Sequence, residues 1–151
     1  RFAPGTGQLG MFQGAKSYLL ETDEGQTLDT YSISAGLDYA SVGPEHAWLK
    51  DIGRVNYSWA TDEEAMNAFR DLSQTEGIIP APESTHAIAA TIREALKAKE
   101  EGVSKTILFN LSGNGVIDLY AYEQYLAGAL KDFSPSDEEI RKTINQLEHL
   151  I

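Results

Sequence analysis

The sequence has no cysteine among its 151 residues and few residues of positive charge. Without cysteine it can form neither a disulfide nor a thiolate metal site. Twelve Lys and Arg against 23 Asp and Glu give a net charge of -11. The basic residues are scattered, which argues against nucleic acid as a partner. We interpret the acidic excess as a solvated surface.

Long apolar runs and the common catalytic motifs are also missing. No apolar run is long enough to cross a bilayer and no basic, apolar leader is present, so we expect a soluble, cytoplasmic protein with no membrane partner. The G-x-S-x-G elbow, the Walker loop and G-x-G-x-x-G are all absent, which removes the usual hydrolase and nucleotide signatures. His46 and His86 have no partners at metal-ligand spacing, so zinc is not expected.

Capping signals and apolar periodicity predict the helices. Residues 61–64 (TDEE) form a capping box, and Ala65, Phe69 and Leu72 then recur on one helical face. Pro44 is expected to start a shorter helix over residues 46–51, which Gly53 closes. These signals are local, so they predict both the type of element and where it begins.

Further helices are predicted in the second half of the chain. A long one follows Pro80 and Pro82 and ends in the charged segment 97–101 before Gly102; its apolar residues are Ile88, Ile92, Ala95 and Leu96. Asp118 is expected to cap a helix through about residue 130. A second capping box at residues 136–139 leads apolar residues at 140, 144 and 147.

Short β-rich runs alternate with these helices. Residues 19–21 and 27–33 are predicted strands around the turn signal at 23–25, and residues 55–59 (VNYSW) and 105–110 are predicted strands between helices. The alternation predicts an α/β fold of three layers, in which helices flank a mainly parallel sheet. A hydrophobic content of 42% fits one α/β domain over residues 1–151.

The first 17 residues carry four glycines and no recognisable start of a helix or strand. We therefore expect the chain to begin within a structure, as the C-terminal portion of a longer two-domain protein. No repeat or low-complexity tract occurs, and no linker composition divides the sequence.

The segment 106–115 (TILFNLSGNG) places small polar residues directly after a predicted strand. Ligands of open parallel sheets bind beyond the carboxyl ends of strands. Gly113 and Gly115 would let a ligand approach the backbone, and Ser112 supplies a neutral hydrogen-bonding group. A binding loop and an ordinary turn both fit this pattern.

Two carboxylates are candidates for chemistry. Glu76, followed by Gly77 and two β-branched residues, could lie near the inner side of the sheet, where burial would raise its pKa and suit it to proton transfer. The alternative, which spacing alone favours, is a helix-terminal Glu that faces water. Asp38 lies in the run 32–39 (SISAGLDY), which is either a binding loop or a turn.

Four ordered blocks resemble a known family. TYSISAGLDYASVGPEHAWLKDIGR, ATDEEAMNAF, TEGIIPAPESTHAIA and TILFNLSGNG, at these separations, are similar to the C-terminal part of the tryptophan synthase β subunit, over roughly residues 8 to 127. The resemblance implies a fold type II pyridoxal-phosphate enzyme that replaces the β-hydroxyl of L-serine with indole. It also implies a dimer and allows pairing with an α subunit.

The resemblance assigns roles to individual residues. Ser112 would hydrogen-bond the pyridine nitrogen of the cofactor, with Gly113 and Gly36 in the cofactor-binding loops. Glu76 would be the acid/base near the reacting carbons, and Asp38 would meet the hydroxyl of the serine substrate. The backbone carbonyls of two further residues, Tyr39 and Ser41, would help hold a monovalent cation.

The chain departs from the family pattern in three ways. Pro82 and residues 120–122 resemble a second, divergent class of β subunits, whereas GLDYASVGPEHAWL resembles the first. Much of the family has S-G-R-G-D-K-D where this chain has SGNGVID at residues 112–118. The Schiff-base lysine of the family, in an H-K-x-N-N-like setting, and its G-G-G-S-N phosphate loop do not occur here, and Lys16 and Lys50 do not lie in that setting. Three hypotheses follow: part of a tryptophan synthase β-type lyase that is inactive alone, a related pyridoxal-phosphate lyase with another nucleophile, or a non-catalytic α/β module.

Overall fold

The computed structural model describes residue 2 and residues 6–129. Two strands, two short 3-10 helices and four α-helices follow one another in this order: β1 (Gln8–Phe12), β2 (Ala15–Leu19), η1 (Ala35–Leu37), α1 (Pro44–Asp51), α2 (Asp62–Glu76), α3 (Pro82–Glu100), η2 (Gly115–Asp118) and α4 (Leu119–Leu126). The helix predicted after residues 136–139 lies outside the described residues.

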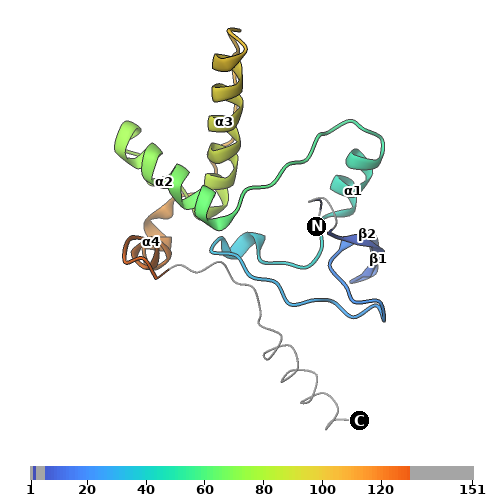
Figure 1. Cartoon of the computed structure of the whole chain (residues 1–151). Helices are drawn as coiled ribbons and strands as arrows, with labels where there is room; N and C mark the ends of the chain where they lie inside the picture. The colour runs from blue at the N-terminus through green and yellow to red at the C-terminus, as the bar shows by residue number, and fades with distance from the viewer. Residues whose placement is uncertain (1, 3–5, 130–151) are drawn as a thin grey trace.

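The described part of the chain is of the α/β type, with helices and one small sheet. In Figure 1, α2, α3 and α4 lie together, whereas α1 packs beside the β1–β2 hairpin, and extended segments join the two groups. Within residues 6–129, no helix is both long and apolar enough to cross a membrane.

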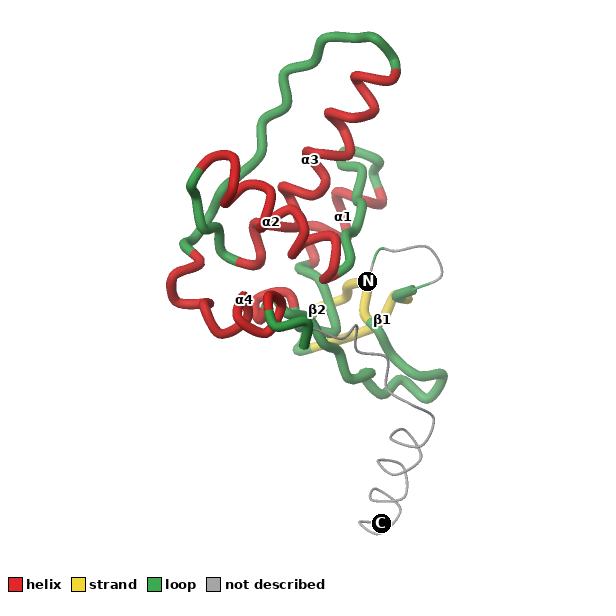
Figure 2. Tube along the Cα trace, turned by 60° about the vertical axis from the view of Figure 1, so that its left-hand side comes forward, coloured by secondary structure: helices red, strands yellow, loops and turns green. Residues whose placement is uncertain are grey.

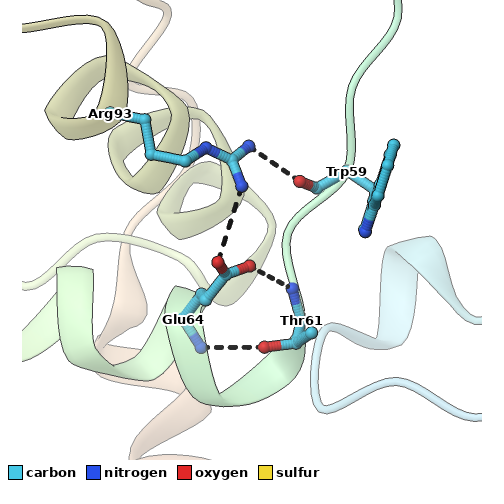
Figure 3. A network of polar contacts seen from close by, with 4 residues as sticks. All are labelled: Trp59, Thr61, Glu64 and Arg93. Atoms are coloured by element: carbon cyan, nitrogen blue, oxygen red, sulfur yellow. Dashed lines mark hydrogen bonds and ion pairs between the residues drawn. The ribbon is translucent and has the colours of Figure 1, made fainter. Parts of the chain in front are cut away.

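The start of α2 confirms the predicted capping box. The Thr61 hydroxyl accepts from the Glu64 amide at 3.1 Å, and the Glu64 carboxylate accepts from the Thr61 amide at 2.9 Å. Arg93 of α3 also binds this region. Its guanidinium donates to the Trp59 carbonyl at 2.7 Å and lies 3.6 Å from the Glu64 carboxylate (Figure 3). The cap thus also ties the entry of α2 to α3.

The core lies where α2 meets α3 and α4. The predicted apolar face of α2 is confirmed at Ala65 and Phe69, which are buried, and at Leu72, which packs against the core. Phe69 stacks on Tyr122 of α4, with ring centroids 3.7 Å apart and planes 7° from parallel. On its other side, α2 packs through Ala68 against Ile88 and two further apolar residues of α3, Ala89 and Ile92.

The helix bounds differ slightly from those predicted. α1 begins at Pro44 itself, and α4 ends at Leu126 rather than near residue 130. Gly128 in the left-handed conformation, with φ 68°, ends α4 because glycine adopts this geometry without steric cost. Asp118 is the N-cap of α4 but its side chain makes no capping hydrogen bond.

The hairpin β1–β2 is an element that the glycine-rich start did not predict. The strands pair antiparallel from Gln8 with Leu19 to Phe12 with Ala15. Gln13 and Gly14 make the turn, with φ of 49° and 78°. Two consecutive positive φ values are typical of a type I′ hairpin turn, for which Gly at the second position is the available signal.

The predicted parallel sheet is not present among the described residues, whose only sheet is the two-stranded antiparallel hairpin. Residues 55–59 and 105–110 are not paired as strands, and the predicted strands 19–21 and 27–33 meet only through an isolated bridge between Glu21 and Thr27. A strand requires a neighbour for its backbone groups. Sequence pattern marks residues suited to a strand, but it does not supply the neighbour.

Candidate functional site

The segment that follows α3 returns along it toward the first turn of the same helix. Figure 2 shows this segment as a long loop that leaves the end of α3 and leads back to α4. Phe109 packs against the cluster of Ala68, Ile88 and Ala89, whereas the side chain of Leu108 is 93% exposed. Half-buried and exposed residues therefore alternate over residues 107–110, and only one face of the segment is covered.

Ser112 reaches α3 at Ser84. The Ser112 amide donates to the Ser84 hydroxyl at 3.1 Å, and that hydroxyl donates to the Ser112 carbonyl at 2.5 Å. The two hydroxyl oxygens lie 3.3 Å apart. Ser84 is buried, whereas Ser112 is exposed, so the buried serine holds the backbone and leaves the other side chain accessible.

The two glycines of this loop are required by close packing. Gly113 has φ 74°, and a Cβ there would lie 2.9 Å from the Cβ of Ala81. Gly115 is buried and its amide donates to the Ile79 carbonyl at 3.0 Å. A Cβ at Gly115 would clash with the Pro80 carbonyl oxygen and lie 2.8 Å from the Tyr122 ring. The loop therefore fits against the connection between α2 and α3.

Residues 32–34 are held by the first residue of α2. The Asp62 carboxylate accepts from the Ser32 hydroxyl at 3.0 Å and from the Ile33 amide at 2.8 Å. The Ser34 amide in turn donates to the Ser32 hydroxyl at 3.1 Å. An acidic side chain at a helix N-terminus, as here, is favoured by the helix dipole.

Two residues of α3 hold the same loop. The Ser34 hydroxyl, which is fully buried, lies 2.9 Å from Nε2 of His86, and the Gly36 amide donates to the Glu83 carboxylate at 2.7 Å. Burial lowers the pKa of His86, although the nearby Asp62 carboxylate opposes this shift. The neutral imidazole is thus favoured in the folded chain.

The two loops that the sequence singled out therefore meet on one helical turn. Gly36 is bonded to Glu83, and Ser112 is bonded to Ser84, the next residue along α3. Gly113 lies against Ala81, just before the same turn. The structure thus brings together the cofactor-binding residues predicted from resemblance, Ser112, Gly113 and Gly36, around the start of α3.

The two predicted carboxylates occupy the ends of helices. Glu76 is the last residue of α2 and is exposed, as the helix-terminal interpretation of the sequence predicts. Gly77 caps α2 in the left-handed conformation. Asp38 caps the 3-10 helix η1 and is also exposed. The inner-sheet location considered for Glu76 is not found, because no sheet lies beside it in the described residues.

Tyr39 and Ser41 lie between η1 and α1, against the hairpin. Ser41 forms an isolated antiparallel bridge with Leu19, and its hydroxyl donates to the Tyr18 carbonyl at 3.1 Å. The Tyr39 hydroxyl donates to Gln13 in the hairpin turn at 2.7 Å. This part of the loop is fixed by the hairpin, whereas residues 32–36 are fixed by α2 and α3.

A cleft of about 930 Å³ lies at this loop. The residues that line it include Gly36, Tyr39, Ser41, Trp59 and His86. Ser112, Glu76 and Asp38 do not line this cleft in the described part of the chain. The cleft therefore involves only one of the two loops.

Sequence reasoning did not find Asp62, Glu83, Ser84 and His86. Each makes its key contact with a residue at least 28 positions away, which no local pattern reveals. The available signal was a run of four polar residues, ESTH at 83–86, in the first turns of α3.

The chain is similar to known tryptophan synthase beta chains. No family model matches the chain. The tryptophan synthase beta chain of Mycobacterium leprae is 53% identical over 117 residues, which are 77% of this chain and 27% of that protein. The tryptophan synthase beta chains of Bordetella parapertussis and Bordetella bronchiseptica are each 49% identical over 114 residues, or 76% of this chain and 28% of theirs.

The resemblance to the tryptophan synthase beta chain is confirmed. The similarity is to a C-terminal part of that protein. The chain spans just over a quarter of the length of the curated tryptophan synthase beta chains that it matches. Both loops and the first turn of α3 lie within the blocks that carried the resemblance in the sequence.

Proposed function

We propose that this chain is the C-terminal part of a pyridoxal-phosphate-dependent lyase of the tryptophan synthase β type, which joins L-serine and indole to give L-tryptophan. One observation carries the proposal beyond sequence similarity. The loops of Ser112 and Gly36, which resemble the cofactor-binding loops of this family, are held by the neighbouring residues Glu83 and Ser84. We propose a single α/β domain that belongs to a longer, two-domain enzyme.

The residues at Ser112 fit one side of the cofactor. The exposed hydroxyl of Ser112 suits the nitrogen of an aromatic ring, and Gly113 adds no side chain beside it. When bound, the cofactor supplies an electron-withdrawing ring that stabilises negative charge on the substrate. A neutral serine is a poor base and cannot hold a proton on the ring nitrogen as a carboxylate would. Ser112 therefore weakens this electron withdrawal, which favours replacement at the β-carbon.

Glu76 and Asp38 are the proposed proton-handling residues. Glu76 would move a proton near the reacting carbons and the indole N–H, and Asp38 would meet the hydroxyl of L-serine as it leaves. Both carboxylates are exposed in this chain. Glu76 is the last residue of α2, and Asp38 caps the end of the short helix η1. They are therefore free to face groups that the remainder of the enzyme contributes.

The remaining parts of the site would come from outside the present residues. The Schiff-base lysine and the phosphate loop of the family have no counterpart in this sequence, so we expect the chain to be inactive alone. We propose that residues 105–110 join a mainly parallel, three-layer sheet of the full enzyme. The fully exposed side chain of Leu108 supports this, since a parallel strand is covered on both faces.

The carbonyls of Tyr39 and Ser41 are proposed to help hold a monovalent cation. Their loop is tied to the hairpin at Leu19 and Gln13, which would keep the carbonyls at a fixed spacing. By resemblance we also propose a cytoplasmic homodimer that pairs with an α subunit.

A second candidate function is a related lyase with another nucleophile. The Asn114 side chain accepts from the Val116 amide at 2.9 Å and starts η2, and Ile117 is 91% exposed. Charged residues occupy this stretch in much of the family, so the surface next to Ser112 is more apolar here. The exposure of Ile117 and Leu108 also argues against a non-catalytic module, which would cover such side chains.

The test is complementation. The chain is co-expressed with the N-terminal segment of the Mycobacterium leprae tryptophan synthase beta chain that precedes the matched region, and the purified complex is supplied with pyridoxal phosphate, L-serine and indole. We expect tryptophan formation that falls at least about 100-fold in Glu76→Gln, the contribution typical of a general acid or base. Glu24→Gln, in an exposed turn, is the matched control.

The outcomes separate the hypotheses. Tryptophan formation without preference for indole over thiols or amines would favour the second candidate. A folded complex that binds pyridoxal phosphate but converts L-serine with no nucleophile would reject the proposed lyase activity. A chain that stays monomeric with no tendency to bind the complementing segment would support a separate module.

A further inference from the structure

Ser84 is a buried hydroxyl whose partners all belong to one other residue. It is 3% exposed, and it contacts three polar atoms of Ser112: the amide nitrogen at 3.1 Å, the carbonyl oxygen at 2.5 Å and the hydroxyl oxygen at 3.3 Å. These three contacts share the one proton and the two lone pairs of the Ser84 hydroxyl.

A serine hydroxyl has one proton to donate and two lone pairs that accept. The proton of Ser84 goes to the Ser112 carbonyl, the closest of the three partners. One lone pair accepts the Ser112 amide proton. The second lone pair is then the only part of Ser84 that can face the Ser112 hydroxyl, so Ser84 has no proton to give it.

The Ser112 hydroxyl is therefore a donor in this network. Its proton can go to Ser84 or, because Ser112 is exposed, to an acceptor outside the chain. The distance of 3.3 Å to Ser84 is long for a hydrogen bond between hydroxyls, so a better-placed acceptor would compete successfully for the proton. An unprotonated aromatic ring nitrogen is an acceptor of this kind.

We propose that Ser84 is a positioning residue, which fixes the backbone of Ser112 and leaves its hydroxyl proton available to an aromatic ring nitrogen. The inference rests on the proposed function and deepens it, since it assigns the orientation of Ser112 to a buried residue of α3. No covalent step is involved.

The surrounding contacts make Ser84 testable without loss of the fold. The loop is independently held at Gly115, whose amide donates to Ile79, and at Phe109, which packs on α3. Removal of the Ser84 hydroxyl should thus free Ser112 locally while the rest of the loop stays in place. The buried site needs a small side chain, so Ala and Cys are the substitutions of choice.

The first experiment measures amide hydrogen exchange at Ser112 by NMR on the complemented protein, before pyridoxal phosphate is added. Ser84→Ala should exchange about tenfold faster than the native chain at this amide, the change expected for loss of one hydrogen bond. Ser84→Cys, a weaker acceptor of similar size, should be intermediate. Ser73→Ala, which removes a hydroxyl bonded to the Ile78 carbonyl, is the matched control and should leave Ser112 unchanged.

The second experiment uses the complemented protein with pyridoxal phosphate labelled with ¹⁵N in the ring. The ¹⁵N shift should report an unprotonated, hydrogen-bonded nitrogen in the native complex. In Ser84→Ala the affinity for pyridoxal phosphate should fall about tenfold and the shift should move toward that of a ring without a donor.

Each result decides a separate point. Unchanged exchange at Ser112 in both Ser84 variants would overturn the positioning role. A protonated ring nitrogen in the native complex would overturn the donor role. A complemented protein that binds no pyridoxal phosphate would overturn the proposed function and the donor role with it, while the exchange result would still decide the positioning role. If Ser84→Ala does not fold, Ser84→Cys carries both measurements.

Discussion

The backbone amide of Gly36 lies 2.7 Å from the carboxylate of Glu83, so that a side chain on residue 36 would meet the side chain of Glu83. A Cβ at Gly36 would lie 2.8 Å from Oε1 of Glu83. The loop that carries Asp38 is thus joined to α3 by a charge-assisted hydrogen bond across 47 residues of sequence.

Removal of the Glu83 carboxylate should release this loop. Glu83→Ala is expected to cost about 1 to 2 kcal/mol, since a charged acceptor for a backbone amide is lost. Glu83→Gln keeps an acceptor and should cost less. Urea unfolding measures the change, and amide exchange at Gly36 locates it. Glu94→Ala, on an exposed part of α3, is the control; equal losses in both variants would contradict the assignment.

Gly115 should not tolerate a side chain. Gly115→Ala would place a methyl group against the Pro80 carbonyl and 2.8 Å from both Ile79 and the Tyr122 ring, so we expect destabilisation of about 1 to 3 kcal/mol or a displaced loop. Gly128→Ala is the matched control, because Gly128 has φ 68° but open space around it. Thermal unfolding of the two variants should separate steric overlap from backbone strain. Similar melting temperatures would show that packing at Gly115 is not limiting.

The hydroxyl of Tyr122 should add to the stability of the fold, beyond the stacking of the Tyr122 ring on Phe69. Tyr122→Phe keeps the stack on Phe69 but leaves the Pro80 carbonyl without its donor, at a cost of about 1 to 3 kcal/mol. Tyr120→Phe, at a 74% exposed site, should be neutral. Denaturant unfolding gives both values, and a neutral Tyr122→Phe would rule out the role assigned to the hydroxyl.

Burial, together with the charges of Asp118 and Glu83, also raises the pKa of Tyr122. The neutral phenol is therefore favoured in the folded state, so its contribution is complete below the pKa of an unfolded tyrosine, about 10, and is lost as pH rises above it. In an absorbance titration Tyr122 should ionise last, at the pH where the chain unfolds.

The contribution of His86 to stability should be lost at acid pH, in the opposite direction to that of Tyr122. Burial lowers its pKa, so the unfolded chain binds a proton more readily than the folded one. Its contribution is complete above the unfolded pKa of about 6.5 and is lost as pH falls through and below that value. The difference in unfolding free energy between the native chain and His86→Gln should shrink from pH 7.5 to pH 5. A difference that stays constant over this range would contradict the role assigned to His86.

Elements with local signals were predictable from the sequence. The capping box at Thr61 and Glu64 uses residues three apart, and Gly77 and Gly102 end their helices with φ of 68° and 66°. Each of these features is decided within one helical turn. The start of α2 and the end of α3 were therefore predicted from the sequence.

Features that depend on distant residues were not predictable. Residues 105–110 have the composition of a strand, but pairing is decided by neighbours that the pattern does not contain. Ser112 was found because the resemblance marks it, whereas Ser84, its partner 28 residues away, looks in sequence like any polar residue in the first turn of a helix. The hairpin turn at Gln13 and Gly14 was missed because the first 17 residues hold four glycines. The sequence alone does not show which of them makes a turn.

The uncovered side of residues 105–110 has a consequence for the chain in solution. With Phe109 on α3 and Leu108 outward, the segment offers an extended backbone and an apolar side chain to any strand that approaches. A free edge of this kind templates intermolecular pairing. Purified alone, the chain should form assemblies whose size rises with concentration, and a complementing segment should act first as a solubiliser and only then as a source of catalytic groups.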